Sequence, residues 1–277
     1  MRLLAISDLH LAYQHNMEAI QRLQTNREDS LILGGDMCET PEVLAQCLGI
    51  LKKKFQKLFW VPGNHELWTT QDESDAPRGE KKYQEMIAVC REFDVSTPED
   101  PISTWICGER EFGIVPLFLL YDYSFRPPEV PENGALAWAK EKGLVCADES
   151  LLYPDPYSSK TEWCNARCQS AHAMLKALPT NMPLILINHF PLRREQVRLP
   201  LIPRFSIWCG TEKTRNWHRE FNVAVVVYGH LHLRSTDFVD GVRFEEVSLG
   251  YPRQWQAKDG IEPYFREILP GPNRGAQ

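Results

Sequence analysis

Five short apolar runs, set between segments with a helical pattern, constrain the fold of this 277-residue chain more than any other feature. Their continuous content of Ile, Leu and Val predicts strands that are buried on both faces of a sheet. The strand–helix–strand–helix–strand order of the first 61 residues predicts an α/β sheet with right-handed crossovers. The five runs cover residues 2–7, 30–35, 57–63, 183–188 and 223–229.

Helix signals lie between these runs. After the first run we expect a helix that opens behind Asn16 as its N-cap. After the second run, Thr40 is typical of an N-cap and Pro41 of a first helical position. Further helices are predicted over residues 78–93 and 161–178.

Two hairpins and two long irregular segments complete the pattern. Residues 103–120 predict one hairpin, and the dipeptide Asp240-Gly241 between alternating residues predicts another. Residues 121–160 are rich in Pro and Tyr and show little periodicity. Together with the loop at 191–210, they are expected to form an irregular rim that contacts the substrate.

The composition is that of an ordinary globular protein, with 43% hydrophobic and 25% charged residues. We expect a single domain over residues 1–269 and a disordered tail at 270–277. The formal net charge of -6 gives no overall attraction to nucleic acid, which is therefore not a favoured partner. The eight cysteines are scattered without a CxxC pair, which predicts free thiols. The chain has no signal-peptide pattern and no apolar run that could span a bilayer, so we expect a cytoplasmic protein without a membrane partner.

Side chains that bind metals follow each of the five apolar runs directly. Because ligands bind beyond the carboxyl ends of the strands of an α/β sheet, we expect these side chains to meet in one small volume. The i, i+2 spacing in D-x-H and H-x-H directs both side chains of a pair to the same side. In chain order the set is Asp8, His10, Asp36, Asn64, His65, Glu66, His189, His230 and His232.

The predicted set contains two Asp, one Asn and four or five His, which is more than one metal ion requires. Two divalent ions bridged by a carboxylate form a common hydrolytic centre. Mixed oxygen and imidazole ligands favour Mn, Fe or Zn over Mg or Ca, and the set has no thiolate of the kind that structural zinc sites use. We therefore expect two divalent metal ions, Mn²⁺ first, with Fe and Zn as alternatives.

The ordered motifs D-x-H, G-D, G-N-H-E, a single His and G-H-x-H resemble the signature of the calcineurin-like metallophosphoesterases, and they span residues 8–232. The resemblance implies a four-layer α/β/β/α sandwich with two metals at one edge. It implies one metal held by Asp8, His10, Asp36 and His232, and a second held by Asp36, Asn64, His189 and His230. In this assignment His65 lies near the metals without binding them.

Glu39 departs from the family pattern. Many members read G-D-x-x-D, with the second Asp paired to the catalytic His, and the protein Ser/Thr phosphatases extend this motif to G-D-x-x-D-R-G. This chain reads GDMCET, so that Glu39 occupies the second acidic position and no Arg-Gly follows. We expect Glu39 to orient His65 from one methylene further out, or another group to take that role.

The expected reaction is hydrolysis of a phosphoester. A hydroxide between the two ions attacks phosphorus, and His65 donates a proton to the leaving oxygen, while Asn64 binds a metal and contacts the phosphate. Arg193 and Arg194, just past His189, are predicted to bind the phosphate because guanidinium groups suit bidentate contacts.

Three functions are compatible with these motifs. We favour a phosphomonoesterase that acts on a phosphoprotein or on a small phosphorylated metabolite. The alternative is a phosphodiesterase that acts on cyclic nucleotides or nucleic acid. A metal-bound scaffold without catalytic activity comes third, because a scaffold does not need the leaving-group acid His65. The sequence does not indicate an oligomeric state.

Overall fold

The computed structural model describes residues 1–25, 27–70, 76–256, 258 and 260–271. Two mixed sheets form its centre, with orders β10-β1-β2-β3 and β4-β5-β6-β7-β9-β8. The first sheet consists of β1 (Leu3–Ile6), β2 (Ser30–Leu33), β3 (Leu58–Trp60) and β10 (Arg266–Leu269). The second consists of β4 (Ser103–Cys107), β5 (Arg110–Pro116), β6 (Leu184–Ile187), β7 (Val223–Tyr228), β8 (Thr236–Val239) and β9 (Val242–Glu246).

All five apolar runs form strands, and within each sheet the neighbours among them pair in parallel. Their apolar side chains fill two interfaces. Leu3, Ile32 and Phe59 of the first sheet pack with Ile185 and Val225 of the second in a layer between the sheets. The side chains on the opposite strand faces pack under helices. Each fully buried Leu, Ile or Val contributes about 1.5–3 kcal/mol, so this central layer fixes how the sheets face each other.

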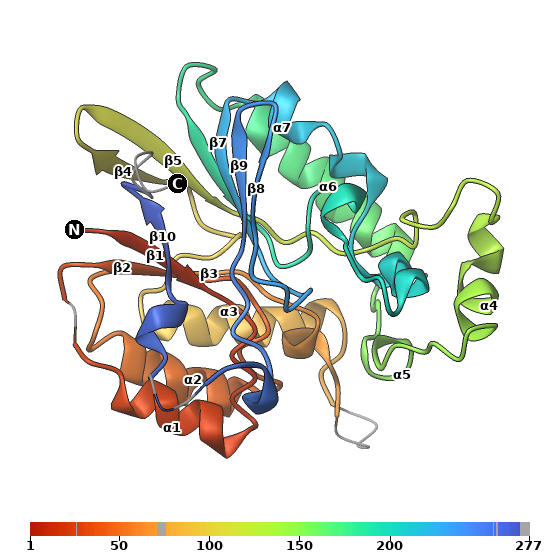
Figure 1. Cartoon of the computed structure of the whole chain (residues 1–277), viewed down its shortest axis with the longest axis horizontal. Helices are drawn as coiled ribbons and strands as arrows, with labels where there is room; N and C mark the ends of the chain where they lie inside the picture. The colour runs from red at the N-terminus through yellow and green to blue at the C-terminus, as the bar shows by residue number, and fades with distance from the viewer. Residues whose placement is uncertain (26, 71–75, 257, 259, 272–277) are drawn as a thin grey trace.

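Helices cover the outer face of each sheet, which gives the four layers α/β/β/α (Figure 1). The first sheet is covered by α1 (Gln14–Arg22), α2 (Pro41–Leu51) and α3 (Glu80–Glu92), and the second by α6 (Lys160–Lys176) and α7 (Trp217–Glu220). Two short helices, α4 (Ala135–Lys140) and α5 (Asp148–Leu151), lie to one side. The α/β fold expected from the sequence is therefore confirmed.

Several local predictions can be compared with the structure. Thr40 caps α2 by accepting a hydrogen bond from the Val43 amide at 3.4 Å, as expected. Asn16 does not cap α1, which begins two residues earlier; it is buried inside the helix, and its amide donates to the carbonyl of Leu9 at 2.7 Å. Both predicted hairpins form, as the antiparallel pairs β4–β5 and β8–β9. All eight cysteines are free thiols.

The remaining predictions concern irregular segments and chain ends. Residues 121–160 are more regular than expected, because they contain α4 and α5. A single domain over residues 1–269 remains a prediction, and residues 272–277 of the expected tail lie outside the described residues. Among the described helices, none combines the length and the apolar character that a membrane span requires. The cytoplasmic location also remains a prediction.

Candidate metal centre

The predicted ligands lie together where the strands of both sheets end. Their donor atoms form three groups, and within each group all the donor atoms lie within 4.8 Å of one another. The segments that follow β1 and β9 are linked there by an isolated bridge between Ser7 and Ser248, so this edge joins the two sheets. The groups are Asp8 with His10 and His232, Asp36 with His189 and His230, and His10 with Asp36 and His65.

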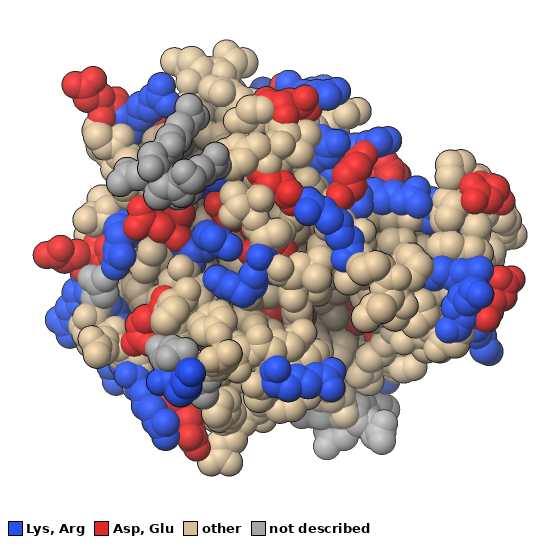
Figure 2. All heavy atoms as spheres, in the orientation of Figure 1, with Lys and Arg blue, Asp and Glu red and all other residues tan. Residues whose placement is uncertain are grey.

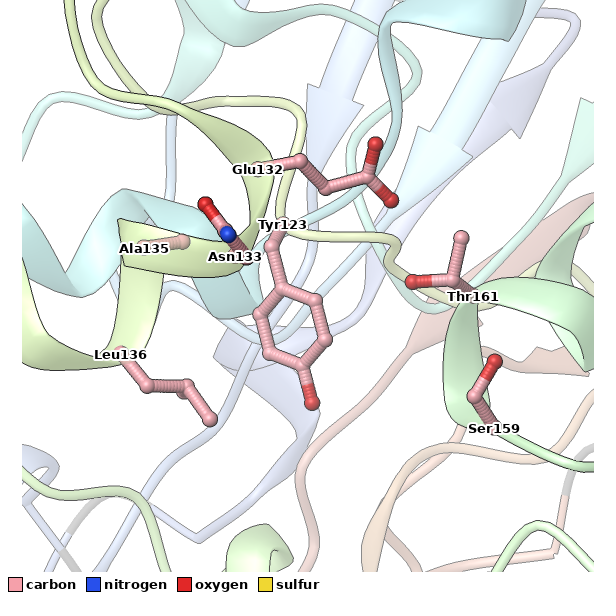
Figure 3. A pocket seen from close by; sticks show the side chains of 7 residues that line it. All are labelled: Tyr123, Glu132, Asn133, Ala135, Leu136, Ser159 and Thr161. Atoms are coloured by element: carbon pink, nitrogen blue, oxygen red, sulfur yellow. The ribbon is translucent and has the colours of Figure 1, made fainter.

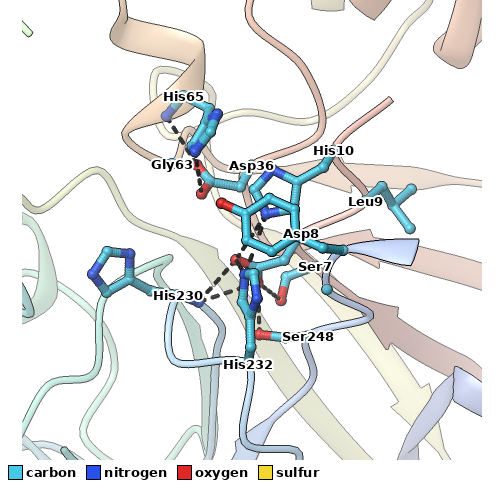
Figure 4. Close-up of polar contacts among 12 residues, drawn as sticks. Ser7, Asp8, Leu9, His10, Asp36, Gly63, His65, His230, His232 and Ser248 are labelled. Carbon is cyan, nitrogen blue, oxygen red and sulfur yellow. Dashed lines mark hydrogen bonds and ion pairs between the residues drawn. The ribbon is translucent and has the colours of Figure 1, made fainter. Parts of the chain in front are cut away.

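The first group is built around the fully buried Asp8 (Figure 4). Its Oδ1 lies 3.0 Å from Nε2 of His232, which in turn lies 3.2 Å from Nε2 of His10. Its Oδ2 accepts hydrogen bonds from the hydroxyls of Ser7 and Ser248 at 2.5 and 2.7 Å. These bonds fix the carboxylate, so that Oδ1 remains directed at the imidazoles.

The second group is built around Asp36. Its Oδ2 lies 3.4 Å from Nε2 of His189, whose Nδ1 hydrogen-bonds the carbonyl of Gly34 at 3.0 Å. Since Nδ1 is occupied, Nε2 is the ring atom that His189 offers to the centre. Asn64 and His230 complete this part of the site.

Three buried donor atoms of the centre have no hydrogen-bond partner among the described residues: Asn64 Oδ1, His189 Nε2 and His230 Nε2. Buried polar atoms without partners are costly and uncommon in folded proteins. Carboxylate, amide and imidazole atoms that converge in one place are the donors that Mn, Fe and Zn accept. The residues present therefore fit the two divalent ions that the sequence predicts.

The backbone at these positions adopts a conformation that side chains disfavour. Non-glycine residues with a left-handed φ are uncommon, and such strain concentrates at functional sites. In this centre the strained residues are candidate ligands that leave a strand end in a sharp turn. Their φ values are 55° for Asp8, 43° for His10, 53° for Asp36, 70° for His230 and 54° for His232.

The pKa shifts of the histidines show that the buried carboxylates of the centre favour positive charge beside them. Burial opposes protonation of His189, but the carboxylates of Asp36 and Asp8 outweigh it and raise the pKa of His189 to about 10. In the same way burial opposes protonation of His232, while Asp8 raises its pKa to about 9. By contrast, burial lowers the pKa of His230 to about 3, and protonated His189 adds to this effect. The two carboxylates thus favour positive charge beside them, which divalent ions would supply.

His65 lies at the edge of the centre with its two ring nitrogens in different surroundings. Its Nδ1 lies 3.2 Å from Oε1 of Glu39, and its Nε2 lies 3.8 Å from Oδ2 of Asp36. Trp68 covers the ring at a centroid distance of 3.7 Å. Burial opposes protonation of His65, but Asp36 and Glu39 outweigh it and raise its pKa. Its Nε2 is therefore the nitrogen that can transfer a proton to a group bound at the centre.

Two acidic residues support the site in ways that the sequence analysis did not assign. The buried carboxylate of Glu66 accepts backbone hydrogen bonds from Asp36, Met37 and Gly63 at 2.7–2.9 Å, which ties two ligand loops together. Glu66 is part of the GNHE motif, so its position carried a signal.

Asp148 is the second of these acidic residues, and it is fully buried. Its Oδ1 accepts from Nδ2 of Asn64 at 3.0 Å and from Nε1 of Trp68 at 2.7 Å. The bond to Nδ2 directs Oδ1 of Asn64 towards the centre. Asp148 lies in the segment that was expected to be irregular, where no sequence pattern indicated a role.

A cavity of about 310 Å³ opens above the candidate ligands. Two loops line it, with Cys146 and Ala147 from one and Leu199, Ile202 and Phe205 from the other. It also contains Trp68, Leu231, Tyr251 and Gln254 beside the candidate ligands. The two irregular segments therefore do border the centre, and their contact with a substrate is a proposal.

The structure does not bring Arg193 and Arg194 into this cavity. The Arg193 guanidinium lies 2.8 Å from the ring of His218, and that of Arg194 donates to the carbonyl of Arg126 at 3.3 Å. Sequence proximity to His189 did not reveal these contacts, which join Arg193 to a residue 25 positions away and Arg194 to one 68 positions away. A phosphate-binding role for these two arginines is not supported by their positions.

A larger hollow of about 550 Å³ lies elsewhere, beside α4 and the start of α6 (Figure 3). It shares no lining residue with the cavity above the ligands, and none of the three donor groups reaches it. Its lining consists of Tyr123, Glu132, Asn133, Ala135, Leu136, Ser159 and Thr161. Size alone therefore does not mark the reactive centre, whereas the convergent donors do.

Comparison with known proteins agrees with this geometry. A family model described as calcineurin-like phosphoesterase matches residues 1–234. This chain belongs to the calcineurin-like metallophosphoesterases, and the resemblance stated from its motifs is confirmed.

Two findings concern one relative in particular. The chain is 43% identical over 272 residues to the acyl-carrier-protein phosphodiesterase PptH of Mycobacterium tuberculosis, across 97% of this chain and 83% of that protein. The crystal structure of phosphopantetheinyl hydrolase (PptH) from the same organism matches with a TM-score of 0.91 at 42% identity, across 98% of this chain and 96% of that one. The chain is thus similar to PptH in sequence and in fold over nearly its whole length.

Proposed function

We propose that this metallophosphoesterase is a phosphodiesterase that removes the phosphopantetheinyl group from a carrier protein. The names of the 43% identical relative, acyl-carrier-protein phosphodiesterase and phosphopantetheinyl hydrolase, include both the carrier protein and the phosphodiester reaction. This evidence favours the phosphodiesterase alternative over the phosphomonoesterase that we preferred from sequence. The substrate that we propose is a phosphopantetheinylated protein, whereas the phosphodiesterase alternative stated from sequence named cyclic nucleotides or nucleic acid.

The chemistry of the cavity wall is the observation that carries this proposal. Among the described residues that line the cavity there is no lysine or arginine. A phosphomonoester bears close to two negative charges at pH 7 and gains from a cationic side chain beside it. A diester bears one charge and two organic substituents, for which Trp68, Ile202 and Phe205 provide apolar surface.

Surface charge is in keeping with a substrate other than long nucleic acid. Figure 2 shows basic and acidic side chains interspersed over one face of the molecule, without a continuous field of one sign. Binding to a nucleic-acid backbone depends on such a basic field.

The base of the cavity would hold the ions. We assign Asp8, His10, Asp36 and His232 to one divalent ion and Asp36, Asn64, His189 and His230 to the other, with Mn²⁺ as the first choice. When bound, two such ions supply a water of lowered pKa and neutralise charge on the phosphoryl oxygens. The hydrogen bonds to Ser7, Gly34 and Asp148 hold the donor atoms in place for this task.

His65 is the group that we assign to the leaving oxygen. Its Nε2 faces the centre, so a proton on this atom can pass to the serine oxygen as the phosphorus–oxygen bond breaks. Oε1 of Glu39 accepts a hydrogen bond from the Nδ1–H group and stabilises the positive imidazolium. This contact supports the role that we propose for Glu39, in which it orients His65 from one methylene further out than an Asp would.

The direct test uses metal-reloaded protein and a phosphopantetheinylated acyl carrier protein. We expect mass spectrometry to show release of the arm and recovery of the unmodified serine, with metal-free protein inactive. In parallel, bis-p-nitrophenyl phosphate should be cleaved faster than p-nitrophenyl phosphate. Faster cleavage of the monoester together with an intact carrier protein would return the assignment to a phosphomonoesterase.

A further inference from the structure

Several exposed apolar side chains belong to, adjoin or contact residues that line the cavity. Nine large apolar side chains are exposed among the described residues, and five of them adjoin residues that line this cavity. We call these five the apolar collar: Tyr13, Val145, Leu201, Ile202 and Leu233.

The position of each member follows from its neighbours. Ile202 itself lines the cavity, and Leu201 beside it is 94% exposed. Val145 precedes Cys146 and Leu233 follows His232, and both of these neighbours line the cavity. The ring of Tyr13 lies 5.6 Å from that of Tyr251, another lining residue. In Figure 2 a stretch of uncharged surface lies between β8 and α5. Exposed apolar surface around a site marks contact with a partner.

The loop beside the collar is basic, although the whole chain is acidic. Residues 193–204 contain four arginines and one glutamate, in a chain with 31 basic and 37 acidic residues. Arg194 and Arg126 form no ion pair with a carboxylate of the described chain, and their guanidinium groups donate only to backbone carbonyls. These two charges are thus available to acidic side chains of a partner.

The proposed reaction requires a folded protein to reach this mouth. In a serine-linked phosphodiester only Cβ and Oγ separate phosphorus from the serine Cα. When phosphorus lies at the base of the cavity, the backbone of the carrier protein therefore lies within one side-chain length of it. The surface around the modified serine must then contact the side chains that surround the opening.

We propose that the apolar collar, together with Arg194 of the loop that carries Leu201 and Ile202 and with Arg126, which Arg194 contacts, is the docking surface for the carrier protein. The partner surface around the modified serine is then apolar with acidic residues at its edge. This inference rests on the proposed function, and it adds the residues by which the enzyme selects a protein-linked diester over a small one.

The test compares two substrates on metal-reloaded full-length protein. Leu201→Asp and Val145→Asp should each lower kcat/KM for the phosphopantetheinylated carrier protein by about tenfold or more, while cleavage of bis-p-nitrophenyl phosphate stays within about twofold. Arg194→Glu should lower kcat/KM for the carrier protein and weaken its dependence on salt. Ile106→Asp, an apolar residue on the edge strand β4 that is about as exposed as Val145, is the matched control and should change neither rate.

Three other results would overturn the docking surface or the proposed function. If wild-type protein cleaves the carrier protein and the collar variants cleave it equally well, the docking surface is wrong while the function stands. If wild-type protein cleaves only bis-p-nitrophenyl phosphate, the proposed function fails first. If it binds vesicles of phosphatidylcholine and phosphatidylglycerol and Leu201→Asp abolishes this binding, the collar serves a lipid surface and our inference is overturned.

Discussion

At the base of the cavity each candidate ligand follows a buried strand directly, whereas the rim comes from two segments with little regular structure. At the base, several candidate ligands have a left-handed backbone conformation, and buried hydrogen bonds such as those of Asp8 and Asn64 hold their side chains in place. The rim is held by short helical turns, and its members include Leu201, which is almost fully exposed. We therefore expect the base to be more rigid than the rim.

This difference separates the chemistry from the choice of substrate. Hydrolysis requires donor atoms within a fraction of an ångström of fixed positions, which strand ends provide. Selection of a substrate requires a surface that can change between relatives, which loops provide. Substitutions at the base should therefore reduce cleavage of every diester, while those at the rim should depend on the substrate.

The largest effect is expected at Asp36, which contributes to two of the three donor groups. Asp36→Asn removes the charge that both ions would share in our assignment, so activity should fall to that of metal-free protein on every substrate. Elemental analysis should show loss of bound metal. Asp94→Asn is a matched control, because Asp94 has a similar φ of 50° but lies on the surface. Full metal content in Asp36→Asn would contradict the bridging role.

The next effect concerns the leaving group. His65→Ala should lower kcat for the serine-linked diester by about 10²–10⁴, because an alkoxide needs a proton to leave. The loss should be far smaller with bis-p-nitrophenyl phosphate, whose leaving group departs without protonation. Metal content should remain that of wild type, and the surface variant His15→Ala should match wild type throughout. Equal losses on both esters would assign His65 to another task.

A smaller effect tests the contact between the rim and the base. Asp148→Ala removes the acceptor of Asn64 and Trp68, so metal affinity and kcat should fall by about 10–100-fold. Asp148→Asn keeps an oxygen in place of Oδ1 and should restore most of both. Metal affinity is measured by competition with a chelator. If the Ala and Asn variants were equally impaired, charge and not orientation of Asn64 would be the function of Asp148.

The sequence predicted the base well because its signals are local. A continuous apolar run predicts a buried strand, and the residue that follows it is placed by the fold, as at His189 and His230. The pairing of Glu39 with His65 was one of two alternatives that the family resemblance left open, and the two side chains lie 3.2 Å apart. The assignment of individual ligands to ions still stands as a prediction.

The sequence predicted which segments border the centre, but it did not predict several individual contacts there and elsewhere, because these contacts join distant parts of the chain. Asp148 contacts a residue 84 positions away, and no periodic pattern carries that information. Asn16 fits a cap by type, yet it fills a buried position where it bonds the carbonyl of Gly250, 234 positions away. Arg193 and Arg194 follow a ligand in sequence but leave the site in space. Sequence proximity to a ligand therefore did not place these two guanidinium groups in the cavity.

The smallest effect is expected at a glycine of the rim. Gly143 has a φ of 70°, and a Cβ there would meet nothing within 4 Å, so Gly143→Ala should cost only about 1–2 kcal/mol of stability through its backbone. Thermal unfolding should show a modest drop in Tm, with kcat/KM unchanged on bis-p-nitrophenyl phosphate.

Gly63→Ala provides the matched variant at the base. A Cβ on Gly63 would lie 2.1 Å from Oδ1 of Asp36, so the ligand must move or the chain must open. We expect this variant to lose metal as well as stability, because the clash falls on the residue that joins two donor groups. Gly63→Ala could instead lose no metal and as little stability as Gly143→Ala. The base would then be as adaptable as the rim, and our assignment of the chemistry to a rigid base and of substrate choice to an adaptable rim would be wrong.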